Sequence, residues 1–156
     1  EFKRIRFDRN GSMTPEPGAK PSLAAENLRI VGNSLYEDAR FRGIPVAMHL
    51  DSGSPRSSLS SRFSQRHAHV VEGLETTDER LAGAGGATTR RSAVMRDTAL
   101  QVAGKTAALP ELSIVVEDGD VEAENFGLLG GDVLKQFAWW ALDFEAMTFE
   151  LGPAVH

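Results

Sequence analysis

Short apolar runs, each ended within a few residues by glycine or proline, set the strongest limit on the fold of this chain. Fifteen glycines and seven prolines are spread over 156 residues. Both residue types interrupt helices and central strands, so long helices are excluded. Most of the remaining runs have strand length, and only residues 57–68 and 132–137 predict short helices. The pattern predicts a mainly β protein built as a small closed or partly closed β-barrel.

The first 27 residues differ from the rest. Residues 1–10 alternate apolar and basic side chains and predict a short edge strand. Residues 11–22 include Pro15, Pro17 and Pro21, a density typical of a linker or extended arm. We therefore expect an N-terminal arm or linker at residues 1–27, a compact domain at residues 28–152 and a tail at residues 153–156.

Within the compact domain, two hairpins are predicted from alternating patterns around short turns. One joins residues 34–41 to 44–50, and the other joins residues 139–144 to 147–151. Further strands are predicted at residues 69–74, 99–102, 105–109, 112–116 and 126–129. Asp132 is expected to cap the short helix that follows it.

Composition excludes several partners and chemistries. The net charge of -5 argues against nucleic acid as the main partner. No apolar run approaches the roughly 20 residues of a membrane span. The absence of cysteine excludes disulfides and thiolate catalysis. The richness in Ala, Gly and Arg fits a bacterial source, and both the periplasm and the cytoplasm are compatible with the sequence.

A carboxylate at the end of an apolar strand is the first candidate for function. Residues 47–50 lead directly into Asp51-Ser52-Gly53-Ser54. An ionised aspartate is rarely buried without a partner. Asp51 therefore either begins an ordinary surface turn or is a held carboxylate with a chemical role, and the motif alone does not decide between them.

Two later segments favour a chemical role for Asp51. Residues 81–89 are dense in glycine and alanine, which opposes a stable strand interior and predicts the tip of a long hairpin. Residues 126–134 place two leucines and a glycine just before a short helix. The residues concerned are Gly83, Ala84, Gly85, Gly86 and Ala87 in the hairpin, and Leu128, Leu129 and Gly130 in the later segment.

In this order, the three segments resemble the retropepsin-like aspartic peptidases, the single-lobe relatives of retroviral proteases. The resemblance covers roughly residues 34–151 and implies a barrel of the acid-protease type. It implies that Asp51 is catalytic and that Ser52, Gly53 and Ser54 support its loop. It also implies that residues 83–87 form a flap over the substrate and that residues 128–130 support the active-site loop.

The same resemblance implies peptide hydrolysis by two aspartates that share one proton. This chain contains only one such motif, because Asp97-Thr98-Ala99 lacks the glycine. The pair of aspartates therefore requires a symmetric homodimer or a second lobe outside this chain. The expected partners are a peptide or protein substrate and that second copy or lobe, and no cofactor is expected.

Two departures from the retroviral pattern leave an alternative open. Pro55 and Arg56 follow the motif where retroviral members have an acidic residue, and Gly131 stands where those members have its arginine partner. The alternative is a catalytically silent lobe that binds peptide or mediates dimerisation. His67 and His69 would share one face of a strand as a metal pair, but no third ligand is evident, which favours surface histidines.

Overall fold

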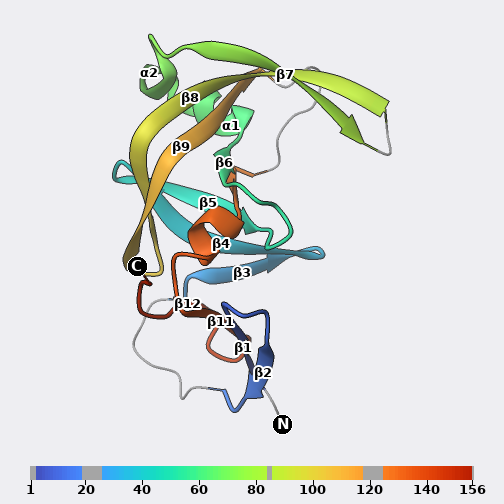
Figure 1. Ribbon diagram of the computed structural model, residues 1–156, viewed down its shortest axis with the longest axis vertical. Coiled ribbons are helices and arrows are strands. Elements are labelled where there is room, and N and C mark those ends of the chain that lie inside the picture. The colour runs from blue at the N-terminus through green and yellow to red at the C-terminus, as the bar shows by residue number, and fades with distance from the viewer. Residues whose placement is uncertain (1–2, 19–25, 84–85, 118–124, 156) are drawn as a thin grey trace.

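Two β-sheets and three short helices make up the described part of the chain, and Figure 1 shows the larger sheet above the smaller one. The computed structural model describes residues 3–18, 26–83, 86–117 and 125–155. The strands are β1 (Arg4–Asp8), β2 (Met13–Glu16), β3 (Leu28–Val31), β4 (Ser34–Phe41), β5 (Ile44–Leu50), β6 (Ser58–Leu59), β7 (Thr76–Gly83), β8 (Gly86–Val102), β9 (Lys105–Glu117), β10 (Gly127–Leu129), β11 (Trp139–Asp143) and β12 (Thr148–Leu151). The helices are α1 (Ser61–Arg66), α2 (Ala68–Val71) and α3 (Gly131–Leu134).

The larger sheet has the strand order β3-β4-β5-β10-β6-β9-β8-β7 and curls back on itself. An additional pairing of β4 with β8 closes the curl, with Ala39 opposite Val102 and Phe41 opposite Leu100. Fully buried side chains from these strands and from α1 fill the interior, among them Phe41, Met48, Phe63, Leu100 and Ile114. The predicted mainly β, partly closed barrel is therefore confirmed.

The two predicted hairpins are confirmed at nearly every residue. β4 and β5 have the predicted bounds, and the turn between them places Arg42 and Gly43 at φ values of 50° and 81°. β11 and β12 pair as the second hairpin. The stretches predicted as three strands after residue 98 are parts of only two long strands, β8 and β9, which pair through to Val102 and Lys105.

The N-terminal residues form part of the smaller sheet, whose order is β12-β11-β1-β2. The predicted edge position of residues 1–10 is wrong, because β1 lies between β11 and β2. Four residues of the predicted linker form β2. An aromatic pair explains the pairing, since Phe7 stacks on Trp140 with ring centroids 3.9 Å apart and an interplanar angle of 10°.

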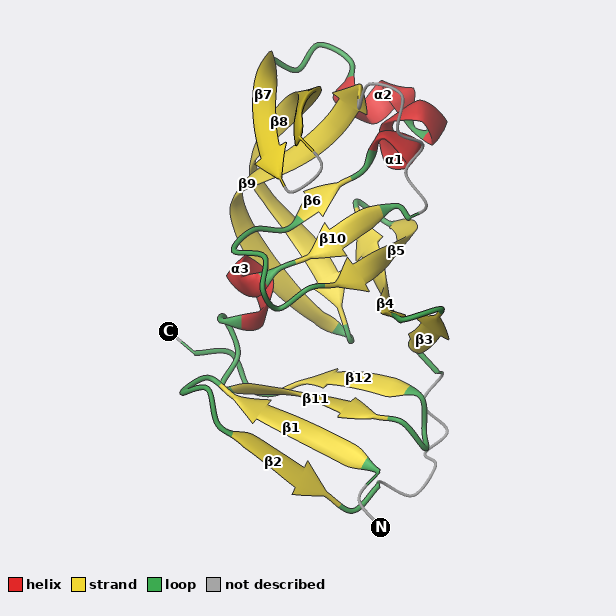
Figure 2. Cartoon of the chain, turned by 90° about the vertical axis from the view of Figure 1, so that its right-hand side faces the viewer, coloured by secondary structure: helices red, strands yellow, loops and turns green. Residues whose placement is uncertain are grey.

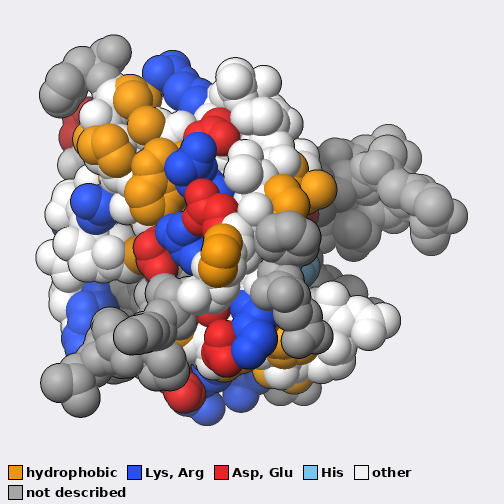
Figure 3. All heavy atoms as spheres, turned by 90° about the horizontal axis from the view of Figure 1, so that it is seen from below, with side chains coloured by type: hydrophobic (Ala, Val, Ile, Leu, Met, Phe, Trp, Pro, Cys, Tyr) orange, Lys and Arg blue, Asp and Glu red, His pale blue; other side chains and the backbone are white. Residues whose placement is uncertain are grey.

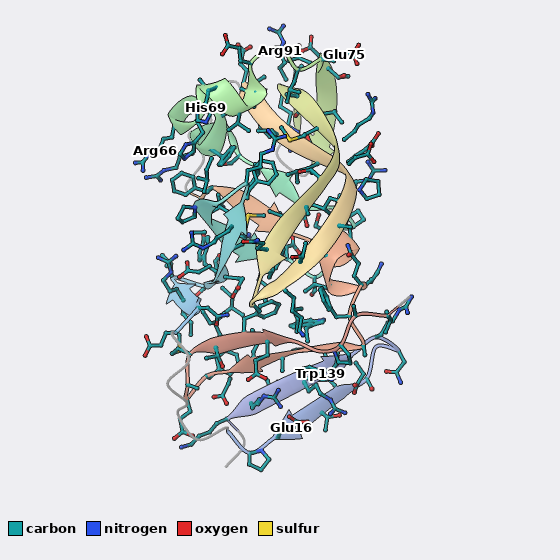
Figure 4. The ribbon with its side chains drawn as sticks, turned by 90° about the vertical axis from the view of Figure 1, so that its left-hand side faces the viewer. Glu16, Arg66, His69, Glu75, Arg91 and Trp139 are labelled. Atoms are coloured by element: carbon teal, nitrogen blue, oxygen red, sulfur yellow. The ribbon has the colours of Figure 1, made fainter. Side chains whose placement is uncertain are left out.

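Charged side chains cover the opposite face of this small sheet. Arg4 forms ion pairs with Glu16 and Glu150 and lies 5.5 Å from the centre of the Trp139 ring. Figure 4 shows Glu16 and Trp139 close together on this sheet. From below, acidic and basic side chains alternate across this end of the molecule (Figure 3). This face is therefore a partly buried, ion-paired surface.

The strand predicted at residues 69–74 is wrong, because residues 68–71 form helix α2. The His67 N–H donates to the Phe63 carbonyl at 2.9 Å, and Glu72 N–H donates to Ala68 at 3.1 Å. Only Val70 of α2 is buried. Packing of this one side chain at the end of α1 outweighs the strand preference of adjacent valines.

A buried carboxyl group lies where the two sheets meet. Glu37 on β4 is 0% exposed. Its Oε1 accepts hydrogen bonds from the Ala103 N–H at 3.2 Å and from the Asn27 amide at 3.4 Å, while its Oε2 has no partner among the described residues. Asn27 also bonds both backbone groups of Phe149 on β12. Burial raises the pKa of Glu37 from 4.5 to about 9.

This shift predicts that folding stability falls as pH rises. Between about pH 4.5 and pH 9 the folded protein holds a proton on Glu37 that the unfolded chain releases, so the free energy of unfolding decreases across this window. Glu37→Gln keeps the Oε1 acceptor and cannot titrate. Denaturant titrations should show the wild type losing at least about 1.4 kcal/mol more than Glu37→Gln over this range, the equivalent of one pKa unit. Equal losses in both proteins would contradict the assignment.

Candidate active site

The candidate site forms where β5 and β10 end side by side. β10 lies between β5 and β6 and runs parallel to β5, with Leu129 opposite Leu50. The Asp51 N–H donates to the Leu129 carbonyl at 3.0 Å. The loop after β5 and the loop after β10 therefore emerge at the same edge, as Figure 2 shows next to α3. The first and third sequence segments are thus brought together.

The Asp51 carboxylate is held by its own loop through one oxygen. Oδ1 accepts hydrogen bonds from the backbone N–H groups of Gly53 at 3.0 Å and Ser54 at 3.2 Å. Among the described residues, no hydrogen bond reaches Oδ2. The side chain is half-buried, whereas Ser52 and Gly53 are exposed. The carboxylate is thus fixed in direction through Oδ1, and the residue next to it, Ser52, is exposed.

Backbone contacts clamp the two loops together. Gly131 N–H donates to the Ser54 carbonyl at 2.8 Å, and Asp132 N–H donates to the Pro55 carbonyl at 3.1 Å. The fit requires glycine at residue 130, because a Cβ there would lie 2.6 Å from the Arg56 carbonyl oxygen. An isolated surface turn has no such second loop. The clamp therefore favours the interpretation of Asp51 as a positioned carboxylate.

A serine and an aspartate that the sequence did not single out as a pair complete the clamp. Ser57 is buried, and its N–H and hydroxyl both donate to the Asp132 carboxylate, at 2.9 Å and 2.6 Å. The same hydroxyl accepts the Gly130 N–H at 2.9 Å. The predicted role of Asp132 as helix cap is wrong, since Gly130 is the N-cap of α3 and no side chain caps it.

The loop that carries Asp51 is supported although Arg56 and Gly131 depart from the retroviral pattern. Gly131 contributes its backbone N–H to the clamp, as described above. Arg56 points to β9, where its Nη1 lies 3.5 Å from Glu111 Oε2 in an exposed ion pair. Such a surface pair contributes little to stability. Support comes instead from the buried Ser57–Asp132 pair, so an ion pair is not needed at this position.

Strands β7 and β8 form the hairpin that the glycine-rich residues 81–89 predict. Ala82 pairs with Ala87 and Gly83 with Gly86, while Ala84 and Gly85 lie outside the described residues. Strand pairing thus extends further into the glycine-rich segment than predicted, because cross-strand hydrogen bonds offset the backbone entropy of glycine. The hairpin projects toward the same side of the molecule as the loop after β5 (Figure 1).

An ion-paired row marks the base of this hairpin. The last pair of β8 with β9 is Arg91 with Glu117, and Arg91 also pairs with Asp78 on β7. Arg91 Nε lies 3.0 Å from the Asp78 carboxylate, and Nη1 lies 3.6 Å from that of Glu117. Arg91 appears at the far end of the molecule from Trp139 (Figure 4). Beyond Arg91, toward the tip of the hairpin, β8 pairs with β7 and no longer with β9. A shift in the β8–β9 register lies between Arg91 and Ser92.

Other sequence candidates lie apart from this site. His67 directly precedes helix α2 and His69 lies within it, so the two histidines do not share the face of a strand. Their ring centroids lie 6.2 Å apart. In the described ranges no group of three His, Asp or Glu side chains could hold a metal ion. An open hollow of about 420 Å³ lies by Arg40, Arg42 and Asp97. The Arg42 turn is at the opposite end of β5 from Asp51.

In the part of the chain that the structure describes, no helix is both long and apolar enough to cross a membrane.

Comparisons with known proteins agree with this geometry at the level of fold. No family model and no curated protein match the sequence. The crystal structure of a retropepsin-like aspartic protease from Rickettsia conorii matches with a TM-score of 0.52 and 19% identity, over 73% of this chain and 93% of that one. The retroviral protease-like domain of Ddi1 from Leishmania major matches 76% of this chain and 87% of that one, with 18% identity and a TM-score of 0.48. The Rickettsia likeness shows that this chain has a retropepsin-like fold.

The Ser57–Asp132 clamp predicts a measurable contribution to stability. Ser57→Ala leaves the buried Gly130 N–H without an acceptor and removes a donor to the Asp132 carboxylate. We expect a loss of about 1–3 kcal/mol in the free energy of unfolding, measured by denaturant titration. Ser54→Ala is the matched control, because that hydroxyl donates only to an exposed backbone carbonyl, and it should change stability by less than about 0.5 kcal/mol. Equal losses would contradict the clamp.

Proposed function

We propose that this chain is one lobe of an aspartic endopeptidase, in which Asp51 residues of two chains together activate a water molecule. The observation that carries the proposal is the Asp51 carboxylate itself. Its loop holds Oδ1 through two backbone N–H groups, a second loop clamps that loop, and no described residue bonds Oδ2. A structural aspartate in an isolated turn would not need the second loop.

In the proposed reaction, two such carboxylates lie close enough to share one proton. Repulsion between like charges separates their pKa values, so that one acts as base and the other as acid. The base takes a proton from water, whose oxygen attacks the peptide carbonyl carbon, and the acid protonates the carbonyl oxygen. When the tetrahedral intermediate collapses, the C–N bond breaks and the leaving nitrogen takes a proton from the pair.

The remaining site residues position these groups. The exposed Ser52 hydroxyl can donate across to the partner loop and fix the distance between the two carboxylates. Gly53 keeps the space beside the carboxylate free of a side chain, because a Cβ there would lie 3.2 Å from Asp51 Oδ1. The β7–β8 hairpin would close over an extended peptide, pair with its backbone as an added strand and exclude water. Extended peptides with apolar side chains are the expected substrates.

The test is cleavage of a peptide library across pH, read by mass spectrometry. Asp51→Asn removes the titratable oxygen and keeps the shape, so cleavage should fall by at least about 10³-fold. Asp97→Asn is the matched control, since Asp97 begins the similar sequence Asp97-Thr98-Ala99, which lacks the glycine of the Asp51 motif, and is exposed. Its φ of 49° suits asparagine as well as aspartate, so cleavage should be unchanged.

Cleavage that survives Asp51→Asn would overturn the proposal. So would a folded, dimeric wild type that cleaves no peptide at any pH. That second result would favour the silent lobe, which would bind peptide or mediate dimerisation without hydrolysis.

A further inference from the structure

We propose that Glu37, Asn27 and Phe149 form a pH-sensitive joint, at which the loss of one proton from Glu37 releases the smaller sheet from the barrel. Glu37 lies on β4 of the barrel, Asn27 directly precedes β3, and Phe149 lies on β12 of the smaller sheet. The inference goes beyond the proposed function and does not depend on it.

Asn27 fastens the smaller sheet to the barrel. Its side-chain amide donates to the Phe149 carbonyl at 3.0 Å, and its Oδ1 accepts the Phe149 N–H at 2.7 Å. The backbone N–H groups of Asn27 and Leu28 both donate to the Met147 carbonyl, at 3.2 Å and 3.1 Å. On the barrel side, the Asp38 N–H donates to the Asn27 carbonyl at 2.9 Å. One residue thus bonds both to β12 and to β4.

Glu37 lies directly against this fastening and is fully buried. Its Oε1 accepts hydrogen bonds from the Asn27 amide and from the Ala103 N–H in the turn between β8 and β9, and neither partner carries a charge. No described residue bonds Oε2. A neutral carboxyl group can be buried in this way, whereas a buried carboxylate without a compensating charge is strongly unfavourable. A proton on Glu37 is therefore a condition for the closed joint.

Burial is also the main influence on the protonation of Glu37, and it raises the pKa of this group to about 9. The residues opposite it on β3 and β5 are Leu28 and Met48, which do not titrate. Among charged side chains, Asp38 raises the pKa of Glu37 and Arg29 lowers it. Because Asp38 and Arg29 form an ion pair with each other, neither supplies a counter-charge for a Glu37 carboxylate.

The smaller sheet is held together by contacts of its own. Phe7 stacks on Trp140 between β1 and β11, and Arg4 pairs with Glu150 between β1 and β12. The buried Asp143 carboxylate accepts two backbone N–H groups of the β11–β12 turn, both at 2.9 Å. The acidic groups of β11 and β12 are thus bonded within the smaller sheet. It can therefore separate from the barrel as a unit.

The connection between the two sheets is weaker than the connections within the barrel. β4 is paired with β3, β5 and β8, whereas among the described residues no strand of one sheet pairs with a strand of the other. Figures 1 and 2 both show β12 as the strand of the smaller sheet nearest to the barrel. Separation at this layer exposes less apolar surface than unfolding of the barrel, so it is the smaller opening that brings water to Glu37.

Proton linkage gives the direction and the size of the effect. Below about pH 4.5 Glu37 is protonated whether the joint is closed or open. Between about pH 4.5 and pH 9 the closed joint holds a proton that the open joint releases, so the equilibrium constant for opening rises by up to about tenfold per pH unit. Above about pH 9 the group is ionised in both states, and the effect levels off.

The test is amide hydrogen exchange, followed residue by residue by NMR between pH 6 and pH 8. The N–H groups of Asn27, Leu28 and Phe149 report opening of the joint, and those of the β8–β9 pair report unfolding of the barrel. After correction for intrinsic exchange, the opening constant of the joint amides should rise at least about tenfold over this range. It should also exceed that of the slowest β8–β9 amides at least about tenfold at each pH.

Two variants complete the test. Glu37→Gln keeps an acceptor for the Ala103 N–H and cannot titrate, so the opening constant of its joint amides should stay within about twofold between pH 6 and pH 8. Glu72→Gln is the matched control, because Glu72 is an exposed carboxylate at the end of α2. It should retain the full rise of the wild type.

Three results would overturn the inference. The first is a wild-type opening constant that does not change between pH 6 and pH 8, and the second is an equal rise in Glu37→Gln. The third is a set of joint amides that open no more often than the slowest β8–β9 amides, because Glu37 would then reach water only when the whole chain unfolds. Should Glu37→Gln fail to fold, the first and third measurements on the wild type decide the question without it.

Discussion

The close contact between the loops after β5 and β10 is the constraint on which the rest of the site depends. It requires glycine at residue 130, where a Cβ would lie 2.6 Å from the Arg56 carbonyl oxygen. It also requires the buried Ser57–Asp132 pair, which satisfies the Gly130 N–H. Because the two loops are held together, the Asp51 side chain has a fixed orientation. The barrel places both loops at the same edge of the sheet, where β5 and β10 end.

A second constraint follows from the chemistry. In the proposed reaction one carboxylate cannot act as acid and base together, so that proposal requires a second Asp51 from a partner. The exposed Ser52 beside Asp51 fits this need, because its hydroxyl can bond to the partner loop. The β1–β2 hairpin meanwhile fills one side of β11 within the chain.

Much of the fold could be predicted from sequence where local signals agreed. β4, β5, β11 and β12 combine alternating patterns with clear turns, and their positions were predicted closely. The α2 segment was misassigned because burial of Val70 outweighs the strand preference of valine. Ser57 and Asp132 were not recognised as a pair because they are 75 residues apart, and no local pattern encodes a contact between distant loops.

The most direct test of shared catalysis is the activity of a mixture. Wild type and Asp51→Asn chains are combined in equal amounts, allowed to exchange, and compared with the same total amount of wild type. If each active site needs an Asp51 from both chains, random pairing leaves about one quarter of the activity. A value of about one half would show that a single chain is sufficient, and it would contradict the account.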